Sequence, residues 1–144
     1  NISEAQRIEG FSIKHDVSVP VSRIPAFLER ARIALQAVWP DVRIVAFGHI
    51  GDGNLHYNLS QSQAVDNQEF MSRKSEANRI VHDLVAELGG SISAEHGLGQ
   101  LKRELLPRYK APLEIDMMRA VKQAFDPGGL MNPGKVLPPE EKKA

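Results

Sequence analysis

The spacing of apolar residues changes repeatedly along this chain, and the order of those changes constrains the fold more than any other feature. Residues 11–20 (FSIKHDVSVP) alternate apolar and polar side chains, which predicts a half-buried strand. Residues 22–39 place apolar side chains at helical spacing instead. The same reasoning predicts two strands, a long amphipathic helix and a short strand over residues 43–50, 54–60, 66–90 and 91–97. The order β-α-β-β-α-β predicts an α+β fold, a ferredoxin-like split βαβ whose antiparallel sheet has two helices on one face.

The last third of the chain is expected to add C-terminal helices and a long loop. Residues 97–106 indicate the start of one helix, and residues 112–125 (PLEIDMMRAVKQAF) predict another with a proline in its first turn. The apolar stripe of that second helix, which includes Met117 and Met118, is expected to face a core. The final stretch is loop-like, and its charged, proline-rich residues 138–144 predict a disordered tail.

Composition narrows the classes of function. The chain has 144 residues, of which 42% are hydrophobic and 25% charged, as in an ordinary globular domain. Lys plus Arg and Asp plus Glu number 18 each, so the basic excess of a nucleic-acid binder is absent. No apolar run approaches the ~20 residues of a membrane helix, and no signal peptide is visible, which predicts a cytoplasmic chain. The lack of cysteine excludes disulfides, thiolate metal ligands and cysteine nucleophiles.

The stretch FGHIGDGNLHYNL predicts a hairpin that carries two histidines. Asp52-Gly53 is a strong signal for a two-residue turn, and with that turn His49 lies directly opposite His56. Alternation along the strands then gathers polar side chains on the sheet face away from the helices. These are Lys14, Asp16, His49, His56, Asn58 and Glu95. His96 follows where the last predicted strand ends.

Two imidazoles and one carboxylate on a common face form a three-ligand set that leaves a position for water or substrate. Such a set suits zinc, with manganese and iron as alternatives. The plainer alternative is a hairpin with two incidental histidines, because a single exposed histidine is usually only polar surface. In the strand order 4-1-3-2, Glu95 starts about two strand spacings, ~9.6 Å, from the strand of His56, which is a long reach.

Four motifs in the same order resemble a known family. They are KHDVSVP, GHIGDGNLHYN, SAEHGLGQLK and FDPGGLMNPGKVL. Together they resemble the C-terminal cap domain of FAD-linked oxidases, the vanillyl-alcohol-oxidase-like flavoproteins that include D-lactate dehydrogenases, the glycolate oxidase FAD subunit and D-2-hydroxyglutarate dehydrogenase. The resemblance implies that residues 1–137 form a cap (substrate) domain. It also implies that the chain is a C-terminal fragment, because the family's N-terminal FAD-binding domain is not in it.

The resemblance also implies roles for individual residues. It implies metal ligation by His49, His56 and Glu95, substrate binding by Lys14, Asn58 and Ser3, proton abstraction and a cofactor contact by His96, and a flavin contact by Asn132. The divalent metal would be zinc, with manganese or iron as alternatives. FAD would be bound mainly by the missing N-terminal domain.

The activity that the resemblance implies is oxidation of a small 2-hydroxy acid to a 2-oxo acid, with hydride transfer to the flavin. The implied partners are that acid and the N-terminal domain of the same parent chain, with no nucleic acid; a dimer stays open. The parent would be cytoplasmic, peripheral to a respiratory membrane, or mitochondrial in a eukaryote. Two alternatives remain, a stand-alone metal-binding or hydrolytic domain and a ferredoxin-like regulatory domain that binds a small acid. Neither accounts for FDPGGLMNPGK.

Overall fold

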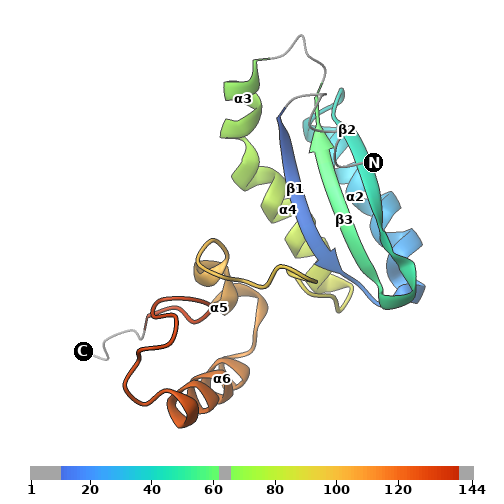
Figure 1. Ribbon diagram of the computed structural model, residues 1–144. Helices are drawn as coiled ribbons and strands as arrows, with labels where there is room; N and C mark the ends of the chain where they lie inside the picture. Colours follow the sequence, from blue (N-terminus) through green and yellow to red (C-terminus); the bar gives the residue numbers. More distant parts are fainter. Residues whose placement is uncertain (1–10, 62–65, 140–144) are drawn as a thin grey trace. The chain divides into compact units, whose positions relative to one another are not determined.

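The computed structural model describes residues 11–61 and 66–139. The chain divides into two compact units, residues 1–95 and residues 96–144, and each is described by itself. The elements of both units are labelled in Figure 1.

The first unit is built on a three-stranded antiparallel sheet. Its elements are β1 (Ser12–Ser18), α2 (Ile24–Val38), β2 (Arg43–His49), β3 (Asn54–Ser60), α3 (Asn67–Ser72) and α4 (Lys74–Glu87). The strand order is β1-β3-β2, so β3 lies in the middle. The α+β class, with an antiparallel sheet and C-terminal helices, is confirmed.

The core of this unit lies between the sheet and the helices α2 and α4, which lie on the same face of the sheet (Figure 1). Phe27 of α2 meets Tyr57 of β3 with ring centroids 5.3 Å apart, and both side chains are fully buried. The rings of His15 in β1 and His82 in α4 meet in the same layer at 5.7 Å. Alternation therefore assigned the helix-facing side of β1 and β3 correctly.

The fourth strand predicted over residues 91–97 is not formed. Only one antiparallel bridge joins this segment to the sheet, between Ser18 and Ser91, with N–H···O bonds of 3.0 and 2.8 Å. The bridge lies on the β1 edge, where the order 4-1-3-2 would put a fourth strand. Beyond it the backbone amides of Ala94 and Glu95 donate to the side chain of Asp16 instead of to a strand. A ferredoxin-like arrangement is therefore matched over three strands only.

The long helix predicted over residues 66–90 is divided in two. Asp66 caps α3 by accepting a 2.9 Å hydrogen bond from the Gln68 amide. The break falls at Arg73, after the Ser72 hydroxyl donates back to the Glu69 carbonyl at 2.6 Å, an interaction that bends helices. Arg73 itself stacks 4.2 Å from the Trp39 ring, which fixes the break against the end of α2.

The second unit contains two short turns of helix and one longer helix. These are a 3₁₀ turn (Arg103–Leu105), α5 (Leu106–Tyr109) and α6 (Pro112–Phe125). The bounds predicted for the last helix are confirmed. Its methionines were predicted to face a core, which is wrong for Met117, at 62% exposed, while Met118 is half-buried. Within residues 11–61 and 66–139, no helix is both long and apolar enough to cross a bilayer.

Candidate functional site

The β2–β3 hairpin is longer at its turn than the sequence predicted. His49 lies opposite Asn54, and His56 lies opposite Phe47, so the predicted His49–His56 pairing is wrong by two residues. The cause is the turn: residues Ile50–Asp52 form a 3₁₀ turn that Gly53 ends in the left-handed conformation. Because the register differs by an even number, both histidines stay on the same face of the sheet.

Two glycines make this hairpin possible. Gly53 has φ 70°, and a Cβ there would lie 2.1 Å from the Val19 carbonyl oxygen. Gly48 has φ 154°, and a Cβ there would lie 2.2 Å from the Asn54 carbonyl oxygen. Contacts that short are impossible for a side chain, so only glycine allows the strands to come this close beside His49.

The side chain of Glu95 lies at the centre of a polar cluster on this face. Its Oε1 is 3.3 Å from Nδ1 of His49, and its Oε2 is 3.7 Å from Nε2 of His56. The Asn54 side-chain amide donates a hydrogen bond to Oε1. The carboxylate therefore joins the two histidines, which the long reach from a fourth strand had put in question.

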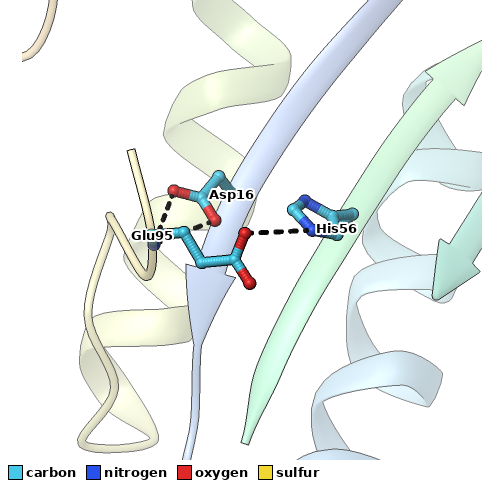
Figure 2. Close-up of side chains that lie close together, drawn as sticks. All are labelled: Asp16, His56 and Glu95. Carbon is cyan, nitrogen blue, oxygen red and sulfur yellow. Dashed lines mark hydrogen bonds and ion pairs between the residues drawn. The ribbon is translucent and has the colours of Figure 1, made fainter. Parts of the chain in front are cut away.

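Asp16 belongs to the same cluster. It is 6% exposed and lies directly opposite His56 in the β1–β3 register. Figure 2 shows its carboxylate against the Glu95 backbone, and the Glu95 side chain reaching toward His56. Donor atoms of Asp16, His56 and Glu95 lie within 4.8 Å of one another, a spacing at which they could hold a metal ion.

The two substrate-binding residues expected on the sheet share this face. Lys14 of β1 is exposed and pairs with Asn58 of β3. The neighbouring pair on the same face is Asp16 and His56, which both belong to the cluster. The face is less open than predicted, because Asn58 is 4% and Asn54 7% exposed. The central position of β3 between two strands explains their burial.

The remaining predicted residues belong to the second unit or lie outside the described residues. His96 and Asn132 are exposed and belong to the second unit. Asn132 has φ 48° and lines a hollow of about 610 Å³ between α6 and the C-terminal loop. Ser3 lies outside the described residues, as does most of the predicted tail, residues 140–144.

Two motifs of the second unit are held together by hydrogen bonds. The Val136 amide donates to the Gly99 carbonyl at 2.8 Å, and Nη1 of Arg103 donates to the Gly134 carbonyl at 2.7 Å. The GLGQLK segment and the NPGK turn are therefore neighbours, and this contact shapes the turn that carries Asn132.

Sequence reasoning placed Asp16 on this face without giving it a role, and it missed Asn54 as a member of the cluster. Asn54 could have been found, because it stands two residues before His56 and alternation places both on one face. Asp16 was assigned to the correct face, but its partners are backbone amides of residues 94 and 95, which leave no mark in the sequence.

The cluster offers imidazole nitrogens and carboxylate oxygens. This donor set fits zinc, manganese or iron, and it contains no thiolate. The donor atoms that lie within 4.8 Å of one another belong to Asp16, His56 and Glu95, and Nδ1 of His49 adds a second imidazole 3.3 Å from the same Glu95 carboxylate. The residues present therefore fit the metal that the resemblance implies.

Comparison with known proteins gives the family. Residues 2–136 match the family described as FAD linked oxidases, C-terminal domain. The chain belongs to this family. Relatives that match the chain are named D-2-hydroxyglutarate dehydrogenase and glycolate oxidase subunit GlcD.

Three relatives illustrate the range of this FAD-linked oxidase family. The chain is 48% identical to D-2-hydroxyglutarate dehydrogenase of Stutzerimonas stutzeri (strain A1501) over 124 residues, which is 86% of the chain and 27% of the relative. It is 37% identical to the mitochondrial D-2-hydroxyglutarate dehydrogenase of Rattus norvegicus over 139 residues, 95% of the chain and 24% of the relative. It is 36% identical to glycolate oxidase subunit GlcD of Bacillus subtilis (strain 168) over 142 residues, 99% of the chain and 29% of the relative. The chain thus spans about a quarter of their length.

Proposed function

We propose that this chain is the C-terminal cap part of an FAD-dependent 2-hydroxy acid dehydrogenase, and that its first unit holds a divalent metal ion through His49, His56 and Glu95. The observation that carries this proposal is the position of one carboxylate between two histidines, with contacts of 3.3 and 3.7 Å. Zinc is the ion that we favour, because a mixed nitrogen and oxygen set with an open position is typical of catalytic zinc. When bound, such an ion acts as a Lewis acid toward substrate oxygens.

The remaining polar residues of this face suit a small hydroxy acid. The exposed ammonium of Lys14 supplies a positive charge for the substrate carboxylate. Asn58, paired with Lys14 across the strands, presents an amide that can donate to or accept from a substrate oxygen. Because both stand on the face of the metal cluster, they orient the acid with its hydroxyl toward that cluster.

The residues of the second unit complete the proposed role. His96 takes the proton of the substrate hydroxyl, for which a neutral imidazole is well suited near pH 7. Asn132, on its exposed turn, contacts the flavin ring. FAD, when bound, accepts the hydride from the substrate carbon, and the protein supplies position and charge.

The share of its relatives that the chain covers bears on where the flavin is bound. Because it spans about a quarter of its relatives, we propose that the flavin is bound mainly by the N-terminal part of the parent protein. A cytoplasmic parent is favoured. In a eukaryote a mitochondrial parent is favoured, because the rat and bovine relatives are named mitochondrial. The isolated chain should be colourless and should not reduce a dye with D-lactate or D-2-hydroxyglutarate, whereas the full-length protein should.

The metal site is tested by calorimetry of zinc binding to the isolated chain. His56→Ala removes one of three ligands and should weaken binding beyond detection, because the two remaining donors no longer enclose an ion. His96→Ala is the comparison variant, since it removes an exposed imidazole that the proposed ligand set does not include. Equal zinc affinity in the original chain and in a His49→Ala, His56→Ala double variant would contradict the proposal.

A further inference from the structure

The carboxylate of Asp16 joins the sheet to the segment that carries Glu95. Oδ2 accepts hydrogen bonds from the Ala94 amide at 3.2 Å and from the Glu95 amide at 3.0 Å, and Oδ1 lies 3.2 Å from the Glu95 amide. These residues are 78 and 79 positions apart in the chain, and Asp16 is 6% exposed. A buried carboxylate with charge-assisted bonds of this kind fixes a backbone more firmly than neutral bonds do.

These bonds change the path of the chain. The bridge between Ser18 and Ser91 would continue into a fourth strand if the backbone ladder extended along β1. Instead the Ser91 hydroxyl donates to the Ser93 carbonyl at 2.8 Å, which closes a local turn. Asp16 then receives the next amides on the face where His56 also lies. The Asp16 side chain thus holds residues 94–95 against the sheet face, where a fourth strand would have followed the edge of β1.

We propose that Asp16 is a positioning residue, whose carboxylate holds the backbone at residues 94–95 so that Glu95 meets both histidines. This inference rests on the proposed metal site and deepens it, because it names what sets the third ligand in place. Asp16 is not itself the ligand in this proposal. Both of its oxygens already face backbone N–H donors, as Figure 2 shows.

Zinc calorimetry is the first test. Asp16→Ala should weaken zinc binding about 10- to 100-fold, the usual cost of losing a group that supports a metal ligand. Asp16→Asn keeps one acceptor oxygen and should fall between Ala and the original residue. Asp126→Asn is a matched control, because Asp126 is likewise buried and accepts from two successive amides, those of Leu130 and Met131, in the second unit. Unchanged zinc affinity in Asp16→Ala would overturn the proposal.

Hydrogen exchange of the metal-free chain is the second test and does not depend on zinc. The Ala94 and Glu95 amides should exchange at least tenfold faster in Asp16→Asn, while the amides of β3 keep their rates. Equal exchange at residues 94 and 95 would overturn the positioning role even if zinc binds. A chain that binds no zinc but loses this protection would instead contradict the proposed metal site and leave Asp16 as the residue that holds Glu95.

The absorption spectrum of bound cobalt separates positioning from ligation. With saturating Co²⁺, Asp16→Asn should show the same band positions and intensities as the original chain, because the ligands are unchanged. A shifted spectrum at saturation would assign Asp16 to the metal and overturn the positioning role. Glu95→Gln should shift the bands, which provides the positive control.

Discussion

Phe27 and Phe125 are both aromatic residues of amphipathic helices, yet they meet opposite environments in the two units. Phe27 of the first unit is fully buried against Tyr57, whereas Phe125 of the second unit is 81% exposed. The difference extends along the helices: Leu113, Met117 and Val121 of α6 are 70%, 62% and 59% exposed. The apolar side chains of α6 therefore recur at the spacing of a buried helix face, but they are exposed.

The two units are therefore stabilised by different means. In the first unit the sheet and two helices enclose an apolar core, which is the main favourable term in folding. In the second unit hydrogen bonds from side chains to backbone are prominent. Asp126 accepts hydrogen bonds from the Leu130 and Met131 amides. The hydrogen bond from Lys122 is the main cause that lowers the pKa of this carboxyl below its usual value, and the bond from Met131 is the next largest. Loops ordered in this way depend on a few polar contacts more than on buried area.

A pair of phenylalanine substitutions tests this comparison most directly. Phe27→Ala leaves a cavity in an enclosed core and should lower the free energy of unfolding of the first unit by about 3–5 kcal/mol. Phe125→Ala should change the stability of the second unit by less than about 0.5 kcal/mol, because the side chain is already in solvent. Urea unfolding followed by residue-resolved NMR measures both. A large loss in Phe125→Ala would show that the stripe of α6 is covered in solution.

A pair of glycine substitutions gives the next largest effect. Gly48→Ala should cost about 3 kcal/mol, because the new Cβ would lie 2.2 Å from a backbone oxygen and the hairpin must shift. Gly129→Ala should cost only about 1 kcal/mol, since φ is 63° but no atom lies within 4 Å of the added Cβ. Thermal unfolding by circular dichroism compares the two. Similar losses would mean that the hairpin is no more tightly packed than the C-terminal loop.

The smallest effect concerns the Tyr57 hydroxyl, which is buried with no hydrogen-bond partner among the described residues. Burial raises the pKa of Tyr57, and Arg32 lowers it to a lesser extent. The stabilisation from keeping this phenol neutral is present below the usual pKa of 10.0 and is lost as the pH rises above it. Tyr57→Phe should thus leave stability at pH 7 unchanged or raise it by about 1 kcal/mol, and should remove part of the loss seen above pH 10.

Urea midpoints measured from pH 7 to pH 11 provide the comparison for Tyr57→Phe. Tyr109→Phe in the second unit is the control, because it removes a phenol outside the first core. An unchanged alkaline slope in Tyr57→Phe would mean that Tyr57 ionises as easily in the folded chain as in the unfolded one.

Local patterns predicted much of the fold and only part of the cluster. Alternation placed β3 at its observed bounds and put His49 and His56 on a common face, because side-chain direction depends on the strand alone. Glu95 reaches the same face without the strand from which alternation was argued. The turn was misjudged because Asp52-Gly53 fits both a two-residue turn and the end of a 3₁₀ turn. The fourth strand was misjudged because the decisive contact joins Asp16 to amides 78 and 79 residues away. Such a contact depends on tertiary structure, and the spacing of apolar residues along the sequence cannot predict it.

The long separation between Asp16 and Glu95 has a consequence for the order of assembly. Hairpins close within microseconds because their contacts are local, whereas contacts between distant residues form later and at greater entropic cost. During synthesis His49 and His56 emerge together, but Glu95 follows 39 residues after His56 and is held only once β1, β3 and the segment after α4 have met. An incomplete chain therefore presents two imidazoles without the Glu95 carboxylate, which the proposed metal site requires. On the proposed function, an ion would therefore be captured only after the first unit has folded as a whole, and it would enter a finished site.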